Sequence, residues 1–244
     1  MKSPSVLDLH THTIASGHAY NSIREMAKSA SEKGLEVLGI TEHAPKMPGT
    51  CHRIYFQNLK VVPREMYGVQ LLIGAEVNIL DYEGNIDLGE SELKQLDLII
   101  ASVHVPCMKV GTVEENTAAY VNAIKNPYVN IIGHPDDGRY QVDYKAIVET
   151  AKEYGKVLEV NNHSLEPNCY RQNAHENYAV MLELCKEYQV PVVMDTDAHF
   201  DTLIGEFDCA RKMLEQLSFP EELVLNRSVA ALKGHVHREL NWDK

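Results

Sequence analysis

Residues 96–104 read Leu-Asp-Leu-Ile-Ile-Ala-Ser-Val-His, a largely apolar run that has the length of one β-strand and ends in a histidine. A run of this kind, without regular polar alternation, is typical of a strand that is buried on both faces, as in a parallel sheet. Six other runs share its length and composition, and they lie at residues 6–10, 36–41, 70–77, 130–134, 157–161 and 191–195.

Amphipathic segments separate most of these runs, and they lie at residues 23–33, 113–124, 143–154, 174–188 and 206–217. Regular alternation of strand and helix predicts an α/β fold with a parallel sheet covered by helices. We therefore predict one domain over residues 1–244, folded as a seven-stranded (β/α) barrel, with an open doubly wound sheet as the alternative. Residues 81–87 are expected to form a small hairpin. Residues 51–68 are an insertion without a clear pattern.

The composition excludes several classes of protein. The net charge is -12 and no cluster of Lys and Arg stands out, so nucleic acid is not an expected partner. No apolar run approaches the roughly 20 residues that span a bilayer, and the N-terminus lacks the apolar core of a signal peptide. The five cysteines are scattered and form no C-x-x-C pair. We expect a cytoplasmic protein that does not bind membranes, with homo-oligomerisation possible.

Two short motifs place metal-binding side chains at strand ends. His10 and His12 are alternate residues at the end of the first run, and Asp197 and His199 have the same spacing after the last run. Alternate residues of an extended chain share a face, so each pair can approach one metal ion. Taken singly, each motif is a weak signal.

The other strand candidates strengthen this signal, because His43, Glu76, His104 and His134 lie at or just beyond the ends of four of them. Strand carboxyl ends converge on one face of a barrel, where active sites lie. A packing explanation would require a buried polar partner for every one of these side chains. His18 lies in a loop and is less secure from spacing alone.

Residues near these candidates are expected to have supporting roles. Asp8 and Asp195 share faces with proposed ligands and are expected to accept hydrogen bonds from ligating imidazoles. His163 follows the sixth run and is expected to support a ligand or to contact substrate. A nucleophilic pair of Cys107 with His104 is a weaker alternative, since a buried, inert thiol explains Cys107 better. The chain has no G-x-S-x-G elbow and no phosphate-binding glycine loop.

The motifs taken in order resemble those of the PHP superfamily (polymerase and histidinol phosphatase), most closely its YcdX-type phosphatase branch. The matching blocks are Asp8-Leu9-His10-Thr11-His12-Thr13, Ser16-Gly17-His18-Ala19-Tyr20, Ile40-Thr41-Glu42-His43, Gly74-Ala75-Glu76, Ala101-Ser102-Val103-His104, Ile132-Gly133-His134-Pro135, Glu159-Val160-Asn161-Asn162, Asp197-Ala198-His199 and Gly205-Glu206-Phe207. The resemblance covers nearly the entire chain and implies a distorted seven-stranded barrel.

The resemblance also implies three divalent metal ions, with Zn²⁺ preferred and Mn²⁺ or Fe²⁺ as alternatives. It assigns the first ion to His10, His12, Glu76 and Asp197, the second to Glu76, His104 and His134, and the third to His18, His43 and His199. Glu76 bridges two ions in this scheme, and Glu76, Asp197 and His199 are the predicted catalytic residues.

The predicted activity is hydrolysis of phosphoric monoesters by a metal-bound hydroxide. Arg171 is a candidate phosphate contact on a small phosphorylated substrate. Histidinol phosphatase and phosphodiesterase or exonuclease activity are alternatives that use the same cluster. A metal-binding protein without catalytic activity is the alternative from a different class.

Overall fold

The structure is a computed structural model that describes residues 4–242. Seven strands are parallel and neighbour one another in chain order, as predicted. They are β1 (Leu7–Asp8), β2 (Val37–His43), β4 (Val69–Asn78), β5 (Leu98–Ser102), β6 (Ile131–Ile132), β7 (Val157–Asn161) and β8 (Val192–Asp195). One further short strand, β3 (Glu65–Met66), pairs antiparallel with the start of β4 and belongs to the insertion for which the sequence predicted no element.

The sheet curves into a nearly closed barrel, so the open doubly wound alternative is wrong. Beyond the ends of β1 and β8, Thr11 and Ala198 form an isolated parallel bridge, and the N–H of His12 donates to the carbonyl of Ala198 at 2.9 Å. In the seam, which is the junction between β1 and β8, Asn226 donates from Nδ2 to the carbonyl oxygens of Leu7 (3.0 Å) and Met194 (2.7 Å). Its Oδ1 accepts from the N–H of Met194 (2.8 Å). A side chain thus replaces strand pairing where β1 and β8 do not meet.

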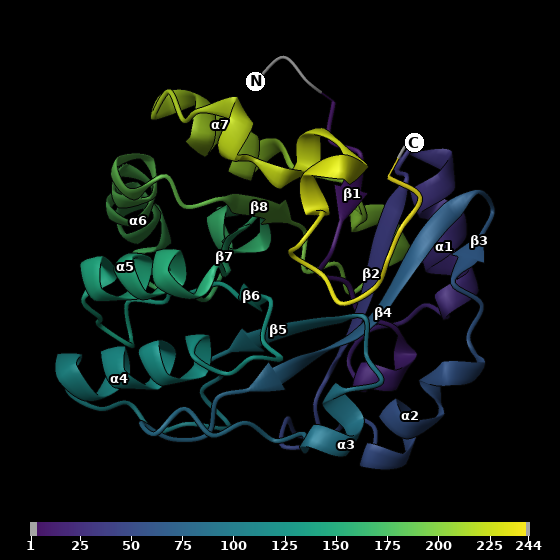
Figure 1. Ribbon diagram of the computed structural model, residues 1–244, viewed down its shortest axis with the longest axis horizontal. Helices are drawn as coiled ribbons and strands as arrows, with labels where there is room; N and C mark the ends of the chain where they lie inside the picture. The colour runs from purple at the N-terminus through teal and green to yellow at the C-terminus, as the bar shows by residue number, and fades with distance from the viewer. Residues whose placement is uncertain (1–3, 243–244) are drawn as a thin grey trace.

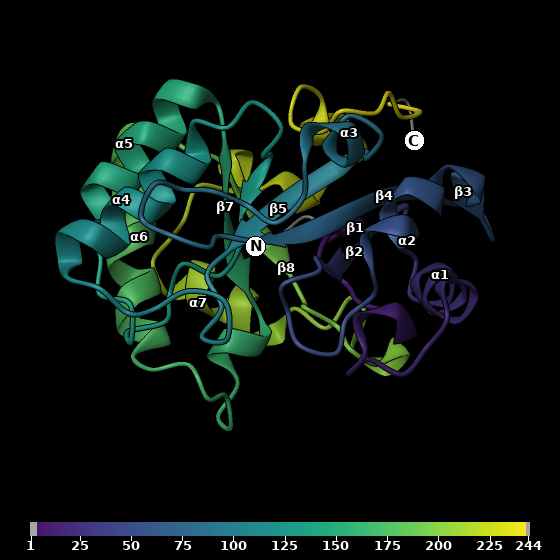
Figure 2. The ribbon, with the colours of Figure 1, turned by 90° about the horizontal axis from the view of Figure 1, so that it is seen from below.

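The helices form the outer layer. They are α1 (Ile23–Glu32), α2 (Arg53–Asn58), α3 (Glu90–Leu93), α4 (Val113–Ile124), α5 (Tyr144–Tyr154), α6 (Ala174–Tyr188) and α7 (Asp208–Gln216). Helices α4, α5 and α6 lie side by side on one flank, while α1 and α2 lie on the opposite flank (Figures 1 and 2). Among residues 4–242, no helix has the length and apolar composition that a bilayer span requires.

Local signals explain where the helices begin and end. Ser22 and Glu25 form a capping box at the start of α1, and Thr112 and Glu115 form another at the start of α4. Helix α5 ends at Gly155, which adopts φ 65°. The predicted ranges for α4 and α6 match their observed ends, whereas α2 and α3 were missed because short helices carry little periodicity.

Alternation along β4 connects the core to the site. Leu72 packs inside the barrel, and positions 74 and 76 share its face. A Cβ at Gly74 would lie 2.1 Å from the carbonyl oxygen of Leu98, so a side chain at this position would collide with the neighbouring strand. The same face then presents Glu76 near the carboxyl end of the barrel.

The C-terminal segment closes the other end of the barrel. Its side chains Leu225, Val229, Leu232 and Leu240 pack in one buried cluster with interior side chains of the strands, among them Leu98. Apolar contact of this kind removes water from the amino end of the barrel and stabilises the closed form. Functional groups are consequently concentrated at the carboxyl end.

Candidate active site

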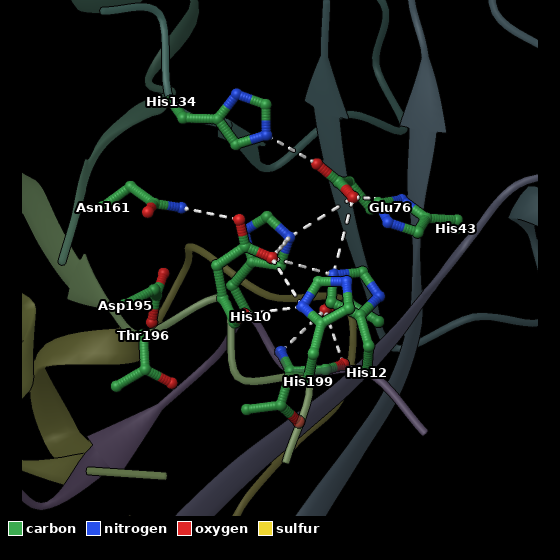
Figure 3. Close-up of polar contacts among 12 residues, drawn as sticks. His10, His12, His43, Glu76, His134, Asn161, Asp195, Thr196 and His199 are labelled. Carbon is green, nitrogen blue, oxygen red and sulfur yellow. Dashed lines mark hydrogen bonds and ion pairs between the residues drawn. The ribbon is translucent and has the colours of Figure 1, made fainter. Parts of the chain in front are cut away.

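The nine predicted ligand side chains gather at the carboxyl end of the barrel, although they come from positions 10 to 199 of the chain. Figure 3 shows His10, His12, His43, His134 and His199 around Glu76. The remaining three are adjacent: His104 contacts Glu76, Asp197 contacts His12, and the ring of His18 stacks on that of His43 with centroids 4.9 Å apart.

Glu76 lies at the centre of this group and is fully buried. Its Oε2 atom is 2.6 Å from His43 Nδ1, 3.4 Å from His10 Nε2 and 3.6 Å from His12 Nε2. Burial alone would raise the pKa of Glu76, but the facing imidazoles, led by His104, hold that pKa well below its usual range. The residue is therefore a carboxylate with imidazoles on several sides.

The other oxygen of Glu76 faces a different pair of imidazoles. Oε1 is 2.8 Å from His134 Nε2 and 3.2 Å from His104 Nε2. His104 is held by Asn78, whose Oδ1 lies 2.8 Å from His104 Nδ1. The two oxygens of Glu76 thus face two separate sets of imidazole nitrogens.

Asp197 occupies the opposite side of His10 and His12. Its Oδ1 is 3.2 Å from His12 Nε2 and 3.6 Å from both His10 Nε2 and His199 Nδ1. Asp197 adopts φ 55°, in the left-handed region that non-glycine residues seldom occupy, and such backbone strain is concentrated at functional sites. Burial raises the pKa of Asp197, but the imidazoles of His10 and His12 lower it well below its usual range.

A third group of nitrogens lies nearer the mouth of the barrel. One ring nitrogen from each of His12, His43 and His199 lies within 4.8 Å of the others. His18 stacks on His199 as well as on His43, with centroids 4.7 Å apart in the former pair. Burial, followed by these two imidazoles, lowers the pKa of His18 to about 4, so its ring is neutral and able to bind a metal.

Unsatisfied atoms test whether this donor set fits metal ions. In the part of the chain that the structure describes, nine buried side-chain atoms make no hydrogen bond of acceptable geometry, although some lie within ion-pair distance of one another. Five of the nine belong to this cluster: His10 Nε2, His12 Nε2, His43 Nδ1, Glu76 Oε2 and Asp197 Oδ1. Orphaned buried polar atoms are costly and rare in folded proteins. Three imidazole nitrogens and two carboxylate oxygens that face one another form a donor set that fits divalent cations such as Zn²⁺, Mn²⁺ or Fe²⁺.

Glu159 supports the cluster from within the barrel and was missed as a site residue by sequence reasoning. Its Oε1 lies 2.6 Å from His10 Nδ1, and its Oε2 accepts from the backbone N–H of His134 at 2.6 Å. The signal was present, because Glu159 is an acid inside the apolar strand β7. Glu159 lies two residues before the end of β7, so the rule that strand ends carry the site does not point to it.

The structure corrects the role expected for Asp8 and Asp195. Asp8 accepts from the N–H (3.2 Å) and the hydroxyl (2.5 Å) of Thr196 and from the N–H of Gly205, and Asp195 accepts from the N–H of Leu9 at 2.6 Å. Both acids lie at the β1–β8 seam, where backbone N–H groups without a strand partner bind the carboxylates. Neither acid forms the hydrogen bond to a ligating imidazole that the sequence suggested.

A cavity of about 480 Å³ opens above the cluster. His18, His43, His104, Asp197 and His199 border its inner end. Arg171 lines the same cavity but is 8% exposed, because it donates to Ser164 Oγ (2.7 Å), Asn161 Oδ1 (3.3 Å) and Asp197 Oδ2 (3.3 Å). His163 also lines the cavity, with its Nδ1 3.0 Å from Glu166 Oε2.

The Cys107–His104 alternative finds little support in the surroundings of the thiol. Burial, followed by the negative charges of Asp87 and Glu76, raises the pKa of Cys107 to about 11. A thiol in such surroundings stays protonated near neutral pH and is a poor nucleophile.

Comparison with known proteins identifies the family of this chain. The PHP domain model matches residues 8–170. A probable phosphatase from Caldicellulosiruptor saccharolyticus is 48% identical over 223 residues, which are 91% of this chain and 92% of that protein. A probable phosphatase from Caldanaerobacter subterraneus subsp. tengcongensis is 48% identical over 240 residues, or 98% of this chain and 94% of that protein.

A solved structure shares the fold at lower identity. Histidinol phosphate phosphatase from Lactococcus lactis, in complex with zinc, L-histidinol and phosphate, has a TM-score of 0.60 and 19% sequence identity, covering 89% of this chain and 95% of that one. From the family match and the long alignments with close relatives, the chain belongs to the PHP domain family, and it is a phosphatase of that family.

Proposed function

We propose that this protein hydrolyses phosphoric monoesters with a trinuclear metal centre, with Zn²⁺ as the preferred ion and Mn²⁺ or Fe²⁺ as alternatives. The observation that carries the proposal is the set of five buried ligand atoms without a hydrogen bond, two of whose residues, His43 and Asp197, line a cavity. One ion is assigned to His10, His12, Glu76 and Asp197, a second to Glu76, His104 and His134, and a third to His18, His43 and His199.

The charge of such a centre explains how an acidic protein binds a phosphate. Three divalent ions bring six positive charges and the two carboxylates return two negative charges, so the inner end of the cavity is strongly positive. When bound, such ions lower the pKa of coordinated water toward 7 and polarise phosphoryl oxygens.

Arg171 is proposed to orient the phosphate. Its three hydrogen bonds to Asn161, Ser164 and Asp197 occupy at most three of the five guanidinium N–H donors, and the others remain for a ligand in the cavity that Arg171 lines. These bonds also fix the plane of the guanidinium, so little entropy is lost when it binds a tetrahedral anion. Arg171 also donates to Asp197, so the guanidinium that is proposed to orient the phosphate also holds a proposed metal ligand in place.

Metal analysis combined with a substrate panel tests the proposal. Purified protein is expected to hold close to three divalent ions per chain, and to hydrolyse p-nitrophenyl phosphate far faster than bis-p-nitrophenyl phosphate. Histidinol phosphate completes the panel as a specific candidate monoester. Chelation should abolish turnover and Zn²⁺ or Mn²⁺ should restore it. Retention of at most one ion after resupply would refute the trinuclear centre, and preference for the diester would favour a phosphodiesterase.

A further inference from the structure

Part of the cavity wall is apolar, although Asn162, His163, Glu166 and Glu206 also line the cavity. Val105 and Pro106 come from the loop after β5, Leu203 from the 3₁₀ turn after β8, and Met47 from the loop after β2. The ring of Tyr170, from the loop before α6, completes this wall. We call these five residues the apolar wall.

Three members of the apolar wall are exposed to solvent. Val105 is 50% exposed, Leu203 is 43% exposed and Tyr170 is 61% exposed. Apolar side chains that remain in water beside a polar site are typical of a ligand-binding surface, because burial by the ligand recovers their hydration cost. The loops of Val105 and Leu203 also carry His104 and His199, so these two side chains are held at a fixed place relative to the proposed metals.

The cationic side chain of Arg139, which also lines the cavity, leaves the apolar wall unchanged in character. Arg139 lines the cavity, but its guanidinium donates to both carboxylate oxygens of Asp137, so its charge is already compensated. The same guanidinium lies over the ring of Tyr170, with Cζ 5.2 Å from the ring centroid. This contact holds the ring in place as part of the wall.

We infer that the apolar wall selects phosphoric monoesters whose leaving group is apolar or aromatic. The inference rests on the proposed function, since it places the phosphate at the metal cluster and the esterified alcohol against the wall. A cavity of about 480 Å³ has room for both parts of such a substrate. The chemistry at phosphorus is unchanged, and the wall contributes through burial of the alcohol portion.

Two primary alkyl esters separate this effect from leaving-group reactivity. Ethyl phosphate and 2-phenylethyl phosphate release alcohols of similar basicity, but only the latter can cover the wall. In the metal-loaded enzyme we expect kcat/KM for 2-phenylethyl phosphate to exceed that for ethyl phosphate by at least about 10-fold, as a hydrophobic pocket provides for added carbon groups. Val105→Ser and Leu203→Ser should each reduce this ratio by about 3- to 10-fold, because each removes buried apolar area.

Val110→Ser is the matched control. Val110 lies in the same loop as Val105, is 54% exposed and is not among the residues that line the cavity, so this variant should keep the wild-type ratio. Metal content is measured for each variant, to show that His104 still binds. A ratio near one in the wild type, or equal ratios in the Val105 and Val110 variants, would overturn the inference. Failure to hydrolyse either ester with metal bound would instead refute the proposed function.

Discussion

Glu159 Oε1 lies 2.6 Å from His10 Nδ1, so a carboxylate inside the barrel fixes the ring whose other nitrogen faces Glu76. A carboxylate behind an imidazole sets its tautomer and makes it a better metal ligand. Glu159 also accepts from the backbone N–H of His134, so one side chain positions two proposed ligands.

Replacement of Glu159 should therefore weaken the metal centre without removing a ligand. We expect Glu159→Gln to lower metal affinity or kcat/KM by about 10- to 100-fold, the usual effect of losing such a support. Metal titration and steady-state kinetics measure both. Glu153→Gln, on the exposed face of α5, is the control and should behave as wild type. Unchanged metal affinity in the Glu159 variant would show that the carboxylate has no role in holding His10.

Glu76 is expected to be the most sensitive position. Glu76→Gln removes a negative charge that lies between two sets of imidazoles, so repulsion between neighbouring ions is no longer screened. We predict loss of phosphatase activity and loss of more than one metal ion per chain. His175→Gln provides the comparison, because His175 bonds to the carbonyl of Leu165 away from the cluster. Near-normal turnover with full metal content in the Glu76 variant would remove Glu76 from the bridging role.

Asn226 should be important for stability, although it is distant from the chemistry. Asn226→Ala leaves the buried N–H and carbonyl groups at the seam, on Met194 and Leu7, without their partner. We expect a decrease of at least about 3 kcal/mol in the free energy of unfolding, since three groups lose their partner and each orphaned group costs about 1–3 kcal/mol. Urea unfolding can be followed by the fluorescence of Trp242, the single tryptophan. The exposed Asn168→Ala should change stability by less than about 0.5 kcal/mol.

A carboxylate that links α2 to α3 should produce a pH-dependent contribution. The hydrogen bond from Arg53 lowers the pKa of Glu92 to about 2 in spite of burial, and Gln57 donates a second bond. In the unfolded chain the pKa of a glutamate is about 4.3. The stabilisation from Glu92 is therefore complete above that pH and disappears as the pH falls toward 2.

Comparison with Glu92→Gln isolates this contribution. The wild type should be the more stable protein at pH 7, and the difference in unfolding free energy should shrink below pH 4. Denaturant unfolding in the presence of chelator measures it without interference from metal binding. Glu83→Gln, at an exposed position, should show no such trend. A difference that is constant from pH 7 to pH 3 would contradict the prediction.

The barrel was predictable because its signals are local. Apolar runs located all seven parallel strands, and helical periodicity located α4 and α6 to the residue. The insertion was not predictable, because α2, η2 (Leu59–Val61) and β3 are each shorter than the window in which periodicity can be detected. Tertiary contacts with the barrel determine these short elements.

The candidate site followed from one geometric rule, and its errors show where that rule stops. Strand carboxyl ends converge in a barrel, which brought eight of the nine ligand candidates together, whereas His18, in a loop, entered the set through the family resemblance. The rule assigned Asp8 and Asp195 by shared faces, but β1 is only two residues long and the seam binds both acids. Asn226 bonds to groups 32 and 219 residues away, and no local pattern indicates contacts of that kind.

The plug that Leu225, Val229, Leu232 and Leu240 form at the amino end of the barrel has a kinetic consequence. With that end sealed, substrate and both products must pass through the same mouth. The phosphate lies deeper than the alcohol in the proposed binding mode, so the alcohol leaves first and inorganic phosphate leaves last. Inorganic phosphate would then be a competitive inhibitor that raises the apparent KM. The free alcohol would be a noncompetitive inhibitor, which lowers the apparent kcat as well.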